Sequence, residues 1–125
     1  MKQFKDLQSG DIIYYYDHCT MKPRTVERTE WDIIEKTEKY RWGDEKFVYK
    51  YLLIYCINGK EPVKIYCTWH EGESSHEGNY FSCKEAAEQW LNGLKYYREC
   101  RINCAKALIE KETNILNKYK FNDLK

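Results

Sequence analysis

A group of residues near position 80 has the side-chain types needed to hold a small anionic ligand. Phe81 offers a flat ring for stacking, Lys84 a cation for phosphate, and Asn92 an amide for a base or for ribose hydroxyls. Arg98 and Arg101 add guanidinium groups, which bind phosphate through paired hydrogen bonds. These types predict a site for a nucleotide-like molecule. The alternative is that Phe81 packs at a helix start and that the charged side chains only meet water.

Two arginines earlier in the chain extend this set. Arg24 lies in a segment that reads as a loop, and Arg28 lies on the strand predicted after it. We expect both to approach the same edge of the protein as the first group. The residues predicted to bind the ligand are Arg28, Phe81, Lys84, Asn92, Arg98 and Arg101.

Four residues have the types of a zinc site, in the order C-x2-H-x5-H-x6-C. Two thiolates and two imidazoles can hold zinc tetrahedrally. This spacing does not match a common finger pattern, so reduced cysteines and loop histidines are the favoured interpretation. We therefore expect no metal and no other cofactor. The four residues are Cys67, His70, His76 and Cys83.

Catalytic motifs are scarce in this sequence. His70 stands close to Glu71, Glu73 and Glu77, a combination suited to general acid–base catalysis. No serine, cysteine or third group is placed to complete a nucleophilic set with them, and the sequence has neither a glycine-rich phosphate loop nor a paired-aspartate metal motif. The sequence therefore favours a binding protein over an enzyme.

Composition and charge limit the classes of partner. The chain has 125 residues, 21 of them basic and 20 acidic, so no strong global field favours a nucleic acid polymer. No apolar window is long enough for a membrane helix, and the N-terminus lacks the apolar region of a signal peptide. We expect a cytoplasmic protein whose six cysteines stay reduced.

The first two thirds of the chain have the pattern of a β-sheet. Aromatic and β-branched runs are separated by turn residues, and Asn58-Gly59 is the strongest signal for a two-residue hairpin turn. Residues 17–24, with Pro23, look like a loop. The run at 47–57 is almost continuously apolar, which predicts a central strand covered on both faces. The predicted strands are 12–16, 26–40, 47–57 and 63–69, with a further short one before Ser82.

After Ser82 the apolar period changes to three or four residues. Ser82 and Glu85 have the spacing of a capping box, which predicts a helix start. The helical segment runs over 82–120, either unbroken or with a break near Glu112-Thr113-Asn114. Such a helix is longer than a small sheet is wide, so we expect a homo-oligomer. The predicted fold is α+β in a single domain, 1–125, with an antiparallel sheet of about five strands over 1–81.

The turn before the first predicted strand suggests an alternative architecture. Leu7-Gln8-Ser9-Gly10-Asp11 has the Leu-x-x-Gly-Asp pattern that opens many SH3-like barrels. An SH3-like barrel with a protruding helix is typical of an interaction module. The alternative function is therefore a phage protein-interaction or virion-accessory protein.

The plan of the whole chain resembles the phage-encoded anti-Thoeris sponge proteins of the first type. An aromatic residue at the sheet–helix junction, Phe81, and a helix asparagine, Asn92, resemble contacts that this family uses. The resemblance implies a non-enzymatic dimer or larger oligomer. It also implies that the protein sequesters cyclic ADP-ribose isomers or related cyclic nucleotides in the host bacterial cytoplasm, and so blocks anti-phage immunity.

Overall fold

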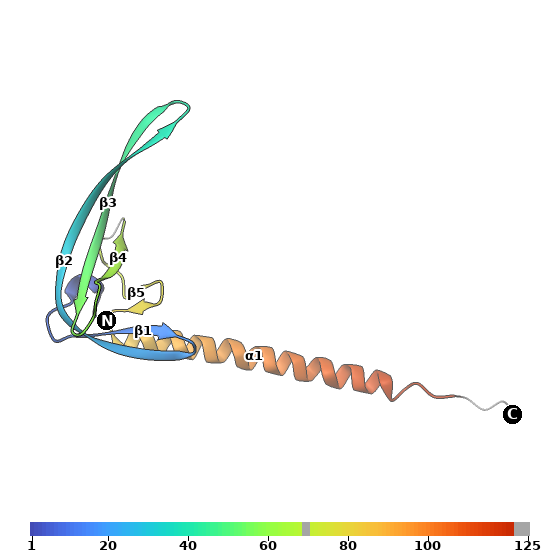
Figure 1. The fold of residues 1–125 in the computed structure, drawn as a ribbon. Helices are drawn as coiled ribbons and strands as arrows, with labels where there is room; N and C mark the ends of the chain where they lie inside the picture. Colours follow the sequence, from blue (N-terminus) through green and yellow to red (C-terminus); the bar gives the residue numbers. More distant parts are fainter. Residues whose placement is uncertain (69–70, 122–125) are drawn as a thin grey trace. The chain divides into compact units, whose positions relative to one another are not determined.

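A computed structural model describes residues 1–68 and 71–121, and it confirms the α+β class. Six antiparallel strands are followed by one long helix (Figure 1). The chain divides into two compact units, Met1–Gln89 and Trp90–Lys125, which are described separately below. The elements are the 3₁₀ helix η1 (Phe4–Asp6), β1 (Ile12–Asp17), β2 (Thr20–Tyr40), β3 (Gly43–Cys56), β4 (Val63–Cys67), β5 (His76–Glu77), β6 (Tyr80–Phe81) and α1 (Lys84–Leu116).

Strand β2 organises the sheet, whose order is β4-β3-β2-β1-β6-β5. Its first residues, Thr20 to Thr25, pair with β1, and the rest of the strand pairs with β3. The register shifts between Val26 and Arg28, at the point where the partner changes. An irregularity of this kind bends a strand and increases its twist. Figure 1 shows β2 and β3 curving together as a long hairpin.

The predicted loop over 17–24 is wrong, because β2 begins at Thr20. The turn between β1 and β2 consists of His18 and Cys19 alone, and both adopt positive φ values, 45° and 66°. Pro23 lies inside the strand, opposite Tyr14. A proline is tolerated there because β2 is paired on only one side over these residues.

Strand β3 is confirmed, but the expectation that both of its faces are covered is wrong. In its second half Leu52, Ile54 and Cys56 are buried on one face, in alternation with half-buried residues. Its first half extends beyond the end of β4, and Val48 there is 67% exposed. The continuous apolar run therefore belongs to an elongated hairpin, whose outer part is covered by no second layer among the described residues.

The hairpin between β3 and β4 is confirmed, whereas the predicted two-residue turn is wrong. Residues 57–62 make the connection, and Asn58 adopts φ 62° while Gly59 keeps a negative φ. The Gly59 N–H donates to the Cys56 carbonyl at 3.1 Å. A Cβ at Gly59 would lie 3.2 Å from that oxygen, so the glycine permits this tight approach.

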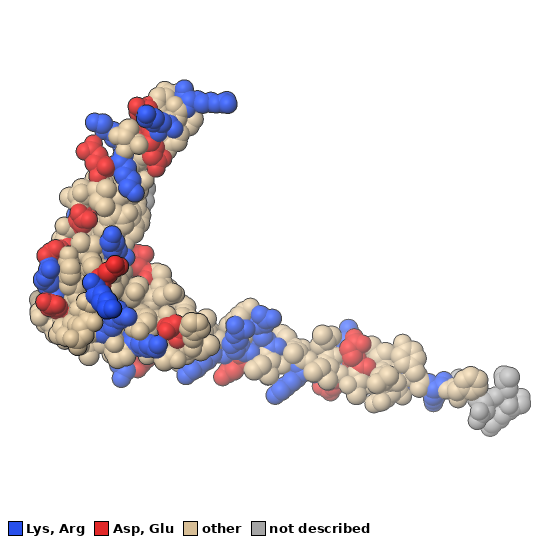
Figure 2. Space-filling view, in the orientation of Figure 1, with Lys and Arg blue, Asp and Glu red and all other residues tan. Residues whose placement is uncertain are grey.

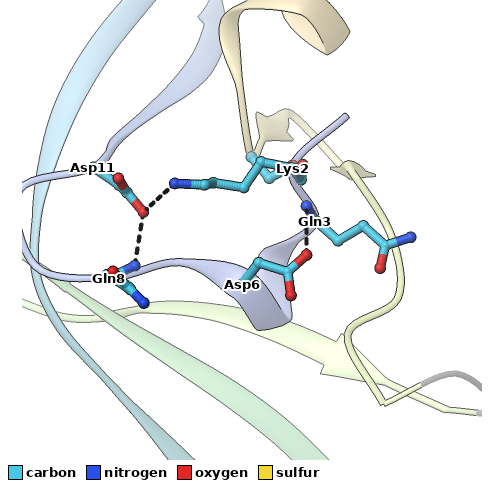
Figure 3. A network of polar contacts seen from close by, with 6 residues as sticks. Lys2, Gln3, Asp6, Gln8 and Asp11 are labelled. Carbon is cyan, nitrogen blue, oxygen red and sulfur yellow. Dashed lines mark hydrogen bonds and ion pairs between the residues drawn. The ribbon is translucent and has the colours of Figure 1, made fainter.

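The N-terminal segment closes the core of the sheet unit. Phe4 on η1 is fully buried, and its N–H donates to the Ser74 carbonyl at 2.8 Å. The predicted turn at 7–11 is present: one Asp11 carboxylate oxygen accepts from Lys2 Nζ and from the Gln8 N–H, both at 2.8 Å (Figure 3). The buried core residues are Phe4, Leu7, Ile13, Val26, Leu52, Ile54, Cys56, Val63, Ile65 and Cys67.

Helix α1 runs without interruption from Lys84 to Leu116, so the break considered near Glu112 is absent from it. The helix begins two residues after Ser82. The Ser82 hydroxyl donates to the Lys2 carbonyl at 2.6 Å, which ties the helix entry to the N-terminal segment. Ala86 and Ala87 are buried, whereas none of residues 90–121 is buried.

Candidate ligand-binding site

The predicted ligand residues divide between the two units. Arg28, Phe81 and Lys84 belong to Met1–Gln89, and Asn92, Arg98 and Arg101 belong to Trp90–Lys125. The predicted residues are therefore described unit by unit. What each group can do is decided by its own surroundings.

The two cations of the sheet unit already have partners. The Arg28 guanidinium stacks over the Tyr55 ring, 3.7 Å from its centre, and forms an ion pair with Glu30. Lys84 is the first residue of α1, and its Nζ lies 3.8 Å from a Glu88 carboxylate oxygen. Both side chains are exposed, so these contacts are weak and leave the cations solvated.

The expectation that Phe81 stacks on a ligand is wrong for this structure, because its side chain has 0% exposure. Phe81 pairs with Tyr14 and with His76 across the sheet. Its ring stacks on the His76 imidazole, with 4.4 Å between ring centres and 14° between planes. Phe81 therefore belongs to the packing of β6 and offers no free ring face.

The three predicted residues on α1 do not share one face. Arg98 and Arg101 are three residues apart and flank Tyr97, whose ring centre lies 5.8 Å and 5.7 Å from their guanidinium carbons. Asn92 lies about 120° from Arg98 and about 180° from Arg101 around the helix axis, at about 100° per residue. One ligand on this helix cannot contact all three side chains.

The sheet unit contains a different concave site. A cavity of about 880 Å³ lies between the start of β2, the β3–β4 connection and β6. This volume is within the range of small-molecule sites, roughly 300–1,000 Å³. Its lining residues are Pro23, Arg24, Thr25, Ile57, Asn58, Gly59, Lys60, Glu61, Pro62, Val63 and Tyr80.

Arg24 is the central charged group of this cavity. In the antiparallel ladders Ile13 faces Arg24 and Tyr15 faces Tyr80, so these side chains share one face of the sheet. The Arg24 guanidinium lies over the Tyr15 ring at 4.5 Å from its centre, and the rings of Tyr15 and Tyr80 are 6.1 Å apart. The register of three strands thus places a cation against two aromatic rings.

The electrostatic state of Arg24 differs from that of its neighbour Lys22. Lys22 Nζ binds Asp17 at 2.9 Å, and this ion pair raises the pKa of Lys22 and lowers that of Asp17. Arg24 is half-buried, and its pKa is raised mainly by a hydrogen bond to Tyr15. Among the residues that the structure describes, no carboxylate forms an ion pair with Arg24. A half-buried guanidinium of this kind favours an anion.

The β3–β4 connection forms the opposite wall of the cavity. The Ile57 N–H donates to the Thr25 carbonyl at 2.9 Å, which fixes the connection beside β2. Lys60 brings a second cation and Glu61 an opposing carboxylate. Pro62, together with Pro23 and Tyr80, supplies apolar surface. The site can therefore hold an anionic group beside a flat ring.

Sequence reasoning found part of this site. It named Arg24 as a contributor, and it recognised the hairpin signal at Asn58-Gly59. It missed Lys60, Pro62 and Tyr80. Alternation along β1 could have indicated part of the site, because Tyr15 follows Ile13 by two residues and so lies on the same face of the sheet.

Of the four residues with the types of a zinc site, His70 lies outside the described residues. Cys67 is buried, and its Sγ donates to the Ile65 carbonyl at 3.5 Å. His76 Nε2 lies 2.7 Å from the Gly78 carbonyl oxygen. Over residues 1–68 and 71–121, no three His, Cys, Asp or Glu side chains lie close enough together to hold a metal ion.

Surface charge is mixed on the side of the molecule seen in Figure 2, where basic and acidic side chains alternate along the β2–β3 hairpin. Within the described part of the chain, no helix is both long enough and apolar enough to span a membrane. Comparison with protein families, with curated proteins and with solved structures finds no match to this chain.

Proposed function

We propose that this protein binds a small anionic, nucleotide-like molecule in the cavity beside Arg24 and does not transform it. The observation that carries the proposal is the half-buried guanidinium of Arg24, stacked on Tyr15 and facing an 880 Å³ cavity without a carboxylate partner in the described chain. An anion in this cavity gains a charge-assisted, bidentate contact. A purine or similar ring beside it meets Tyr80 and the two prolines.

The proposal of binding without catalysis is supported by the chemistry of the lining. Glu61 is the only carboxylate among the eleven lining residues, and no cysteine, histidine or serine is among them. A carboxylate beside Lys60 on an exposed connection is poorly placed as a tuned general acid or base. Sequestration of a cyclic nucleotide or cyclic ADP-ribose isomer, as in the anti-Thoeris sponge proteins, is the role we propose. It implies action in the bacterial cytoplasm, where such signals are made.

A thermal-shift panel tests this function. Cyclic ADP-ribose isomers, cyclic dinucleotides and linear nucleotides are added to the full chain at increasing concentration. A ligand that binds the folded state raises the melting temperature by the linkage free energy RT ln(1 + [L]/Kd). Mass spectrometry of the recovered ligand then separates binding from turnover. A flat panel at high micromolar concentration, or a hydrolysed product, contradicts the proposal.

Arg24→Gln and Arg28→Gln form a matched pair for the same assay. Both arginines lie on β2 and stack on a tyrosine, but only Arg24 lines the cavity. Loss of a charge-assisted contact should weaken binding about tenfold or more in Arg24→Gln. Arg28→Gln should bind as the unmodified chain does. Equal losses of ligand affinity in both variants would show that the ligand does not bind in this cavity.

A protein-interaction module is a second candidate, supported by strand connectivity. β2 is shared between two halves of the sheet, and β1 pairs with the last strand, β6, as in SH3-like barrels. The outer β2–β3 hairpin exposes Trp31, Ile33 and Val48 on the face that is buried further in. In this case Ile33→Asp should abolish co-purification of a partner while the nucleotide panel stays flat.

A further inference from the structure

Helix α1 has an exposed apolar stripe along the part that belongs to the second unit. At about 100° per residue, the apolar positions cover less than half of the circumference, and the rest carries residues such as Asn92, Glu99 and Asn103. Leu108 on the stripe is 59% exposed. An uncovered stripe of this length indicates an association surface. Its apolar members are Leu91, Leu94, Tyr97, Ile102, Ala105, Leu108, Ile109, Ile115 and Leu116.

About midway along the helix, one edge of the stripe borders a shallow hollow of about 360 Å³. Cys104 and Ala105, which have small side chains, lie between the larger Tyr97 and Leu108. A large apolar side chain from a facing helix fits such a hollow, as a knob fits a hole in paired helices. Leu108 is itself a side chain of the required kind.

Three charged residues lie within the apolar stripe, and their signs are segregated along the helix. Arg98 and Arg101 lie in its N-terminal half, and Glu112 lies in its C-terminal half. The Tyr97 hydroxyl accepts from Arg101 at 3.4 Å, which holds this guanidinium beside the hollow. A parallel pair of identical helices would place Arg101 against Arg101 and Glu112 against Glu112. An antiparallel pair would place opposite charges together.

We propose that the stripe binds the same stripe of a second copy, with the two helices antiparallel. When Leu108 of the second copy enters the hollow at Ala105, Glu112 of that copy lies one turn further along, opposite Arg101. Leu108 and Glu112 are four residues apart, as are Arg101 and Ala105, so the packing contact and the charge contact occur in the same register. The contact is self-complementary, and its two-fold axis passes between Ala105 and Leu108. This interface does not depend on the ligand site proposed above.

Charge reversal at the two paired positions tests the orientation. Sedimentation equilibrium of the full chain should show a dimer, and Arg101→Glu or Glu112→Arg alone should weaken it roughly tenfold, because each creates two like-charge contacts. The double variant, Arg101→Glu with Glu112→Arg, should restore affinity to within a few fold of the unmodified chain. Far-UV circular dichroism confirms that each variant keeps its helix.

Glu99→Lys and Lys106→Glu serve as matched controls on the polar side of α1, and both should leave dimer affinity unchanged. Weakening by the controls equal to that of the stripe variants would overturn the proposal, since only net charge would then matter. Single variants without effect, or a double variant that stays weak, would overturn the antiparallel register. A monomer throughout the micromolar range would overturn the interface itself.

Discussion

The sheet unit and the helical unit differ in how they treat apolar side chains. In the first unit, residues as distant in sequence as Phe4, Ile13 and Ile65 meet in one core and are almost completely buried. In the second unit, residues 90–121 include no buried side chain, and Ile109 is 65% exposed. Cross-strand pairing closes a core within one chain, whereas a single helix buries almost nothing by itself. Under the proposal above, a second copy covers the helical stripe, whereas the sheet core is closed within one chain.

Cysteine reactivity should show the largest difference between the two units. Cys56 and Cys67 in the sheet core are buried, and desolvation raises the pKa of both thiols, while Cys104 on the helix is exposed. In native protein diluted until the proposed dimer has dissociated, iodoacetamide should label Cys104 at least about a hundredfold faster than Cys56, because reaction at Cys56 requires an opening that costs several kcal/mol. Peptide mass spectrometry over time measures the ratio. Similar rates would mean that the sheet core is not closed.

Two isoleucine truncations compare the inner and outer parts of the long hairpin. Ile54 is 0% exposed and Ile33 is 64% exposed, although both lie in the β2–β3 ladder. Ile54→Ala should lower the free energy of unfolding by about 2–5 kcal/mol, since it leaves a cavity in the core. Ile33→Ala should lower it by less than about 1 kcal/mol. Urea unfolding followed by tryptophan fluorescence gives both values. A comparable loss from Ile33→Ala would show that the outer hairpin is covered in solution.

Acid titration should give the smallest effect. The pKa of Asp11 is held below its ordinary value of 3.8, chiefly by the hydrogen bond from Lys2 and then by the Gln8 N–H. A carboxylate whose pKa is lower in the folded state than in the unfolded state stabilises the fold at any pH above the unfolded-state pKa. This contribution is lost as the pH falls below about 3.8.

Asp11→Asn tests this contribution in the sheet unit. It should lower stability at pH 7 by about 1 kcal/mol or less, as expected for a partly exposed ion pair. The variant should also show a shallower loss of stability between pH 5 and 3, a window set from the ordinary value of 3.8. Asp44→Asn, at an exposed position near the hairpin tip, is the control. If the stability of Asp11→Asn and that of the unmodified chain fell in parallel between pH 5 and 3, the contacts of Asp11 drawn in Figure 3 would not stabilise the fold.

Most helices and strands could be predicted from the sequence, because hydrophobic period and turn chemistry are local properties. Aromatic and β-branched runs separated by turn residues predicted β1 and the β2–β3 and β3–β4 hairpins, and the turn at 7–11 is held by Asp11. The apolar period of three or four residues predicted the helix after Ser82. The start of β2 at Thr20 was not predicted, because the turn before it has an unusual backbone conformation. His18 and Cys19 both adopt the left-handed conformation without being glycine, which no propensity signals.

Which side chains are available for binding depends on tertiary contacts and could not be predicted from the sequence. Phe81 became part of the packing because β6 pairs with both β1 and β5, and Arg24 came to face Tyr15 and a cavity because β2 begins earlier than its composition suggests. Both outcomes depend on strand register, which is set by contacts between residues far apart in the chain. A shift of one residue would exchange the two faces of a strand, so residue types alone could not select the site.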